Sequence, residues 1–119
     1  MNTEKTPIIR SDDDELLGFI VQISAGSWEA RTVFDYIITR TTDRQSAEET
    51  VRRDGLKFLS GIWQYYDIDD YDWHPCVIKE ANQTNVTVVR TNVMGYQDPD
   101  NYKLVVIESP DETRFLKSQ

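Results

Sequence analysis

Hydrophobic and polar residues alternate with a period of two along much of the chain, which is the spacing of a half-buried β-strand. The pattern is clearest over residues 16–24 and 28–39, where a short turn containing Gly26 separates the two runs. We expect these runs to form an antiparallel hairpin. Further apolar runs predict strands over residues 62–66, 73–80, 85–91 and 102–108, with a loop over 92–101.

One segment has the signature of a helix. Thr42 and Gln45 have the spacing of a capping box, in which the hydroxyl and the amide satisfy backbone groups at a helix start. The pattern predicts a helix over residues 43–54 whose apolar face carries Ala47 and Val51. Gly55 follows at the position where a left-handed residue commonly ends a helix.

The predicted fold is α+β, with a mostly antiparallel sheet of about six strands in the order ββαββββ and one helix packed on one face. Isoleucine and valine together number 20 and threonine 11, against 6 leucines and 4 alanines, which favours sheet over helix. We expect residues 1–11 to be a flexible N-terminal tail and residues 12–108 a single α+β domain. Residues 109–119 are expected to be a C-terminal tail or a short helix, because the segment 109–112 has capping-box spacing with Pro110 at the first helical position.

Charge and composition narrow the functional classes. The net charge of −8 opposes direct nucleic-acid binding, which needs a basic surface. We find no apolar run long enough to span a membrane and no secretory leader, so a cytoplasmic location is expected. The single cysteine cannot form an internal disulfide or a thiolate zinc cluster.

The most distinctive segment is residues 63–73, where aromatic and acidic side chains alternate. If the hairpin register aligns four of the rings, they converge beside four carboxylates, a surface that suits a cationic group or a protein hot spot. The alternative is that the rings simply pack the sheet. The predicted partner-binding residues are Trp63, Tyr65, Asp67, Asp69, Asp70, Tyr71, Asp72 and Trp73.

Two other patterns give weaker support for a functional site. The acidic run from Asp67 begins like a calcium-binding loop, but Asp72 and Ile78 stand where glycine and glutamate are required, so no metal site is predicted. His74 and Cys76 lie two apart on a strand and face the same way, yet no orienting group or oxyanion motif accompanies them. No catalytic residue and no cofactor is predicted.

The leading functional hypothesis is a small acidic, non-enzymatic interaction module that binds a protein partner through the hairpin 63–73. The alternative is an acidic inhibitor, such as an immunity protein or a nucleic-acid mimic, that blocks a basic enzyme. A small enzyme using His74 and Cys76 is the third hypothesis. Strand edges at Pro75 and residues 102–108 offer a route to homo-oligomers.

Overall fold

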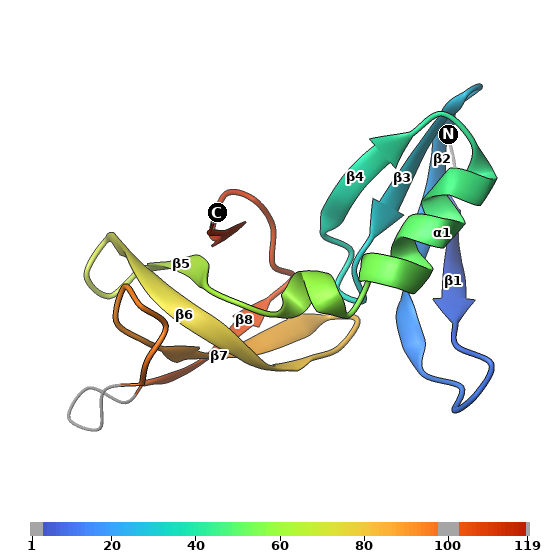
Figure 1. Ribbon diagram of the computed structural model, residues 1–119. Helices are drawn as coiled ribbons and strands as arrows, with labels where there is room; N and C mark the ends of the chain where they lie inside the picture. The colour runs from blue at the N-terminus through green and yellow to red at the C-terminus, as the bar shows by residue number, and fades with distance from the viewer. Residues whose placement is uncertain (1–3, 98–102, 119) are drawn as a thin grey trace. The chain divides into compact units, whose positions relative to one another are not determined.

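The computed structural model describes residues 4–97 and 103–118. The chain divides into two compact units, Met1–Leu59 and Ser60–Gln119, and each is described by itself. Figure 1 traces both units from the N-terminus to the C-terminus. The boundary falls inside the range 12–108 that the sequence led us to treat as one domain.

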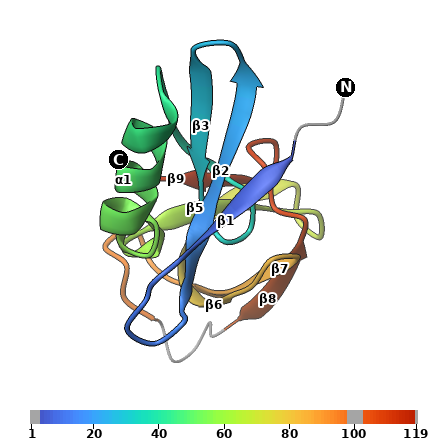
Figure 2. The ribbon, with the colours of Figure 1, turned by 90° about the vertical axis from the view of Figure 1, so that its right-hand side faces the viewer.

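The first unit is a four-stranded antiparallel sheet with one helix on one face (Figures 1 and 2). Its elements are β1 (Lys5–Ile9), β2 (Leu16–Ser24), β3 (Ser27–Arg31), β4 (Ile37–Thr41), the helix α1 (Arg44–Asp54) and the short 3₁₀ helix η1 (Lys57–Leu59), and the sheet order is β1-β2-β3-β4. Neighbouring Ile20 and Ala30 pack with Ala47 and Val51 of α1, and all four are fully buried. One face of β2 and β3 therefore supplies the surface that the helix covers.

The ends of α1 differ from the capping box that the sequence predicts. Asp43, not Thr42, is the N-cap, and its carboxylate accepts a hydrogen bond from the Ser46 amide at 2.7 Å. Gly55 has a right-handed conformation, with φ −53°, so the predicted left-handed cap is absent. A Cβ at Gly55 would lie 2.3 Å from the Leu17 carbonyl oxygen, so this glycine permits close approach of the helix end to β2.

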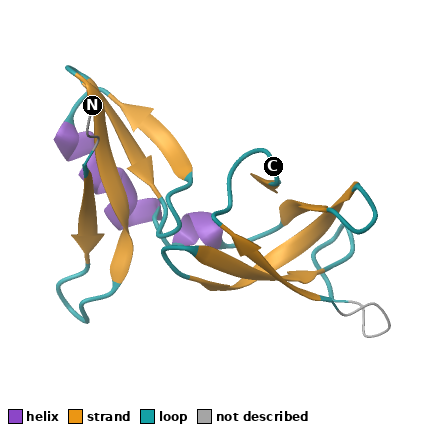
Figure 3. Ribbon diagram, turned by 180° about the vertical axis from the view of Figure 1, so that it is seen from behind, coloured by secondary structure: helices purple, strands orange, loops and turns teal. Residues whose placement is uncertain are grey.

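The second unit is a five-stranded antiparallel sheet, whose strands are seen from behind in Figure 3. It contains β5 (Trp63–Asp67), β6 (Asp72–Ala81), β7 (Asn85–Arg90), β8 (Leu104–Glu108) and β9 (Phe115–Lys117), in the order β8-β7-β6-β5-β9. The last strand thus returns beside the first strand of the unit. There the Phe115 ring stacks on the Trp63 ring, with centroids 4.5 Å apart and planes 10° apart, and both side chains are fully buried.

The predicted α+β class and the mostly antiparallel pairing are confirmed, but the number and grouping of the strands differ. The described residues form nine strands in two sheets rather than about six in one. The predicted strand 28–39 is interrupted, because a tight turn at residues 32–36 is closed by the Tyr36 amide donating to Thr32 Oγ1 at 3.1 Å, with Asp35 at φ 69°.

Both predicted terminal segments were also wrong in part. Lys5–Ile9, expected in a flexible tail, is an edge strand that buries Ile8, and edge strands tolerate the Pro7 within it. The possible C-terminal helix is a turn followed by β9, because burial of Phe115 against Trp63 favours an extended segment. Residues 1–3 of the predicted tail, 98–101 of the predicted loop and the first residue of the predicted strand 102–108 lie outside the described residues.

Candidate functional site

The hairpin of β5 and β6 carries all the residues predicted to bind a partner. Its register places Trp63 opposite Cys76, Tyr65 opposite His74 and Tyr66 opposite Trp73. Because successive side chains point to opposite faces, the rings separate into two groups. Trp63 and Tyr65 are at most 1% exposed, whereas Trp73 lies on the other face and meets the edge of Tyr66 at 5.6 Å. The expected convergence of four rings on one surface is therefore wrong.

The acidic residues of this hairpin build its turn. The Asp67 carbonyl accepts a hydrogen bond from the Tyr71 amide, and the Asp67 carboxylate accepts one from the Asp69 amide, both at 2.8 Å. Asp70 accepts from the Asp72 amide at 3.1 Å, and Asp72 accepts from the Trp73 amide at 2.8 Å. Short carboxylates that bind nearby amides in this way fix turn geometry. The carboxylates at positions 67, 70 and 72 thus have a structural role.

The turn exposes a small set of side chains, residues 68–71, which we call the hairpin tip. Ile68 is 71% exposed and Tyr71 78% exposed, and Asp69 and Asp70 beside them are also exposed. Tyr71 has φ 57°, in the left-handed region that a bulky residue rarely occupies. The tip therefore presents an aliphatic and an aromatic side chain on a backbone held by several hydrogen bonds.

Asp67 anchors the tip to the rest of the unit. Its buried carboxylate binds the Arg90 guanidinium at 2.8 Å and the Lys103 ammonium at 2.6 Å, and Arg90 Nε donates to the Tyr65 hydroxyl at 2.8 Å. The hydrogen bond from Lys103 holds the pKa of Asp67 below its usual value and raises the pKa of Lys103. Burial raises the pKa of Tyr65. The network ties the end of β5 to the end of β7 and to Lys103, the residue that precedes β8.

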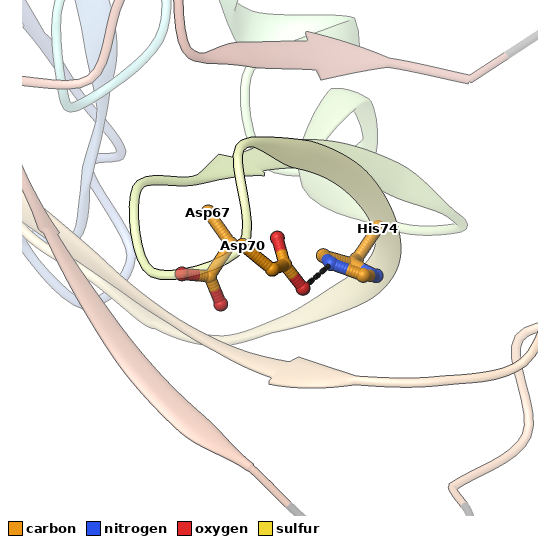
Figure 4. A group of neighbouring side chains, drawn as sticks. All are labelled: Asp67, Asp70 and His74. Atoms are coloured by element: carbon orange, nitrogen blue, oxygen red, sulfur yellow. Dashed lines mark hydrogen bonds and ion pairs between the residues drawn. The ribbon is translucent and has the colours of Figure 1, made fainter.

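Asp67, Asp70 and His74 bring three potential metal ligands together (Figure 4). Their ligand atoms lie within 4.8 Å of one another, and His74 Nε2 is 2.6 Å from Asp70 Oδ2. However, Asp67 Oδ2 already contacts Arg90 and Lys103, and Asp67 Oδ1 accepts from a backbone amide. A metal cation would face two positive side chains at this carboxylate, so the charges around Asp67 oppose cation binding.

A cleft of about 330 Å³ lies beside the tip, and we call it the edge cleft. One wall is the strand β8 and the other is the end of β5 with the turn that follows. Its lining residues are Tyr65, Tyr66, Asp67, Ile68, Asp69, Lys103, Val105, Val106, Ile107, Glu108 and Arg114. The sequence did not reveal the β8 wall, because β5 and β8 are not neighbours in the sheet order and line the same cleft only in the folded unit. The apolar run 104–107, whose Leu104 and Val106 are half exposed, was the available signal.

Cys76 does not have the surroundings of a reactive thiol. Its side chain is fully buried, and burial raises the pKa of the thiol to about 12. The thiol is therefore protonated at neutral pH, whereas a nucleophilic cysteine needs a thiolate. His74, the potential base, is bound to Asp70. This environment removes the support for a Cys/His catalytic pair.

The first unit also holds a buried carboxylate, Glu29. Its two oxygens bind Arg31 at 2.6 Å and Arg40 at 3.0 Å. Each oxygen thus has a cationic partner, as buried charges require. We interpret this cluster as structural, because its polar groups satisfy one another.

The eight predicted partner-binding residues therefore fall into three groups. Trp63, Tyr65 and Asp67 are buried, and Trp73 is half-buried against Tyr66. The exposed group is Asp69, Asp70, Tyr71 and Asp72. Only this last group is fully available to a partner, together with Ile68, which the sequence did not single out.

Comparison with known proteins finds no matching family model, no similar curated protein and no similar solved structure. Within residues 4–97 and 103–118, no helix has the length and apolar character needed to cross a membrane.

Proposed function

We propose that this protein is a small acidic, non-enzymatic interaction module that binds a protein partner through the hairpin tip. The observation that carries the proposal is the exposed side chain of Tyr71, whose backbone is held at φ 57° in a hydrogen-bonded turn. A left-handed conformation costs roughly 1–2 kcal/mol for a residue other than glycine. Strained residues of this kind gather at ligand-binding sites, where the surrounding structure holds them in place.

The chemistry of the tip supports a protein partner. Tyrosine gives a large contact area and a polar hydroxyl at a low cost in side-chain entropy, and it is enriched among the residues that dominate binding energies. Ile68 adds a second apolar contact, while Asp69 and Asp70 form a charged rim. Because the turn is fixed before binding, little ordering free energy opposes the association. A cytoplasmic setting agrees with the one free, buried cysteine.

One observation supports a second candidate function, that of an acidic inhibitor. The acidic residues 12–15 of the first unit are all exposed, as are Asp69, Asp70 and Asp72 of the second. Exposed charge of one sign accelerates association with a basic protein. This candidate differs from the first in its requirement for charge rather than for the Tyr71 ring.

Photocrosslinking tests the proposed function. The full chain carries benzoylphenylalanine at position 71 and is irradiated in a lysate of its source organism. The matched control carries the same group at Tyr96, which is also exposed and lies in the same unit. We expect one discrete protein adduct at position 71 that is absent at position 96. Equal adduct patterns at the two positions, or none at position 71, would contradict the proposal.

The crosslinked protein is then identified, purified and titrated onto the wild-type chain and the Tyr71→Gly variant. Glycine removes the ring and adopts φ 57° without strain, so the fold is retained. We expect the dissociation constant to rise at least about tenfold, in the range of a hot-spot residue. An unchanged constant would favour the acidic inhibitor, whose affinity depends on the carboxylates instead.

A further inference from the structure

The strand β8 has an open edge. It pairs only with β7 among the described residues, and it ends the order β8-β7-β6-β5-β9 (Figure 2). The Arg90 amide donates to the Lys103 carbonyl, and the Ser109 amide donates to the Thr84 carbonyl. Hydrogen-bonded positions alternate along an antiparallel pair. The backbone groups of Leu104, Val106 and Glu108 therefore point away from β7.

The edge cleft lies along this open side of β8. Lys103, Val105, Val106, Ile107 and Glu108 all line it, whereas no residue of β7 does. The Arg114 side chain closes one end by donating to the outward Glu108 carbonyl at 2.8 Å. The contact of Lys103 with Asp67 at 2.6 Å closes the other end. Between these two ends, the backbone amide and carbonyl of Val106 have no hydrogen-bond partner among the described residues.

The side chains of the cleft favour an extended segment with apolar residues. Tyr66 and Ile68 on one wall face the wall formed by Val105, Val106 and Ile107. An unpaired strand edge beside apolar side chains is the surface to which peptides bind by adding a strand. Backbone hydrogen bonds then provide affinity, and alternate side chains provide specificity.

The charge of this unit indicates which peptides fit. Residues 60–119 contain ten acidic and five basic side chains. Within the cleft, Lys103 is paired with Asp67, while Asp69 is 81% exposed and lies 3.6 Å from Lys103. Glu108 is exposed, and Arg114 binds its carbonyl rather than its carboxylate. The lining therefore holds three carboxylates, Asp67, Asp69 and Glu108, against the two basic side chains of Lys103 and Arg114, and this acidic surplus complements a basic side chain in the bound segment.

We infer that the edge cleft binds an extended peptide segment in which apolar residues alternate with at least one lysine or arginine, and that the segment pairs with the Val106 backbone of β8. The inference rests on the proposed function, because it assigns a bound segment to the same interaction module. The peptide occupies the cleft beside the hairpin tip rather than the tip itself.

Peptide display on the intact chain tests this inference. Random 12-residue peptides are selected on the immobilised full-length protein, and a synthetic copy of the most enriched one is titrated by amide NMR. We expect enrichment of alternating apolar residues with lysine or arginine, and shift changes on residues 103–108. The absence of enriched peptides, or shifts that lie away from residues 103–108, would overturn the inference.

A proline at position 106 separates backbone pairing from other contacts. Val106→Pro removes an amide that faces the cleft and makes no bond to β7, and edge strands tolerate proline. The matched control, Val106→Thr, keeps the amide and the β-branched shape. We expect the selected peptide to bind Val106→Pro at least tenfold more weakly and Val106→Thr within threefold of wild type. Equal weakening in both variants would overturn pairing with the backbone.

Methylated peptides provide the same test without a change to the protein. Copies of the selected peptide are methylated on one alternating set of amides or on the other. We expect one set to abolish binding and the other to retain it, since only one set can face β8. Loss with both sets or with neither would contradict strand addition. If the peptide bound Val106→Pro as it binds wild type and failed to bind Tyr71→Gly, the inference that it binds in the edge cleft would be overturned. That result would leave the proposed function standing.

Discussion

Asp67 shows at the scale of a residue how one carboxylate organises the candidate site. It accepts hydrogen bonds from the Asp69 amide, from Arg90 and from Lys103. A charged hydrogen bond of this kind contributes about 1.5–3 kcal/mol, and the loss of the carboxylate leaves two cations without their partner. The position of the hairpin tip and of one end of the edge cleft therefore depends on this side chain.

Replacing Asp67 with asparagine should destabilise the second unit by about 2 kcal/mol at neutral pH. The folded-state pKa of Asp67 is lowered, chiefly by Lys103, so its contribution is present above the unfolded value of about 3.9 and is lost as the pH falls through the folded value. The difference in stability between wild type and Asp67→Asn should thus be full above about pH 5, begin to shrink near pH 4, and vanish only as the pH falls through the lowered folded pKa of Asp67. Urea unfolding followed by amide NMR signals of the second unit measures it.

Asp69→Asn is the matched control. The Asp69 side chain is 81% exposed, and its carboxylate lies 3.6 Å from the Lys103 ammonium, farther than the 2.6 Å that separates Asp67 from Lys103. Its effect on stability should stay within about 0.5 kcal/mol at every pH. A difference for Asp67→Asn that did not change with pH would show that the carboxylate charge is not what matters at this position.

The acidic hairpin could be located from the sequence. Which of its aromatic rings lie in the core and which lie on the surface could not. The spacing of two residues puts Trp63 and Tyr65 on the same face of β5, as its register with β6 shows. Their burial depends on Phe115, which is about fifty residues further along the chain, and on Arg90. No local pattern encodes such distant contacts, so the distinction between core and surface rings required the structure.

At the scale of elements, the helix α1 illustrates a glycine that serves packing rather than chain reversal. The sequence correctly predicted where α1 ends, but for the wrong reason. Gly55 is right-handed, and a side chain there would lie 2.3 Å from the Leu17 carbonyl oxygen and 2.5 Å from that of Val51. The absence of a Cβ lets the helix end approach β2. This tertiary requirement could not be read from the residues around Gly55.

Gly55→Ala should therefore destabilise the first unit by at least about 2 kcal/mol, although alanine ordinarily favours a helical conformation by about 0.5–1 kcal/mol. The helix end must shift to relieve the contacts, which disturbs the packing of Val51 against the sheet. Gln45→Ala, on the exposed side of the same helix, should change stability by less than about 0.5 kcal/mol. Thermal unfolding of both variants, monitored by circular dichroism, decides whether Gly55 tolerates a side chain.

The short strands were the elements hardest to predict. β1 has five residues and β9 three, and both pair at a sheet edge. Pro7 made the first of these segments look like a tail, while the spacing of residues 109–112 suggested a helix before β9. Each strand has one buried anchor, Ile8 in β1 and Phe115 in β9. β1 pairs with the next strand, β2, whereas β9 pairs with β5, which is distant in sequence.

At the scale of the whole molecule, the charge is unevenly divided between the units. Residues 1–59 carry 11 acidic and 8 basic side chains, and residues 60–119 carry 10 and 5. Long-range attraction depends on all these charges, whereas the lifetime of a complex depends on the groups in contact. The two effects allow the interaction module and the acidic inhibitor to be distinguished by their kinetics.

For the peptide selected on the intact chain, the association rate should fall severalfold as ionic strength rises from about 0.05 to 0.5 M, because salt screens exposed charges beyond about 10 Å at 0.1 M. The double variant Asp12→Asn/Asp14→Asn removes charge from the first unit, and asparagine tolerates the φ of 58° at position 14. It should slow association and leave dissociation unchanged.

Asp69→Asn removes a charge that lines the edge cleft, so it should both slow association and accelerate dissociation. Surface plasmon resonance of wild type and the two variants over the salt range separates the two rates. If the double variant in residues 12–14 accelerated dissociation as much as Asp69→Asn does, the carboxylates of the first unit would be in contact with the ligand. Binding would then depend on acidic charge over both units, as the inhibitor hypothesis requires, and not on the edge cleft and hairpin tip alone.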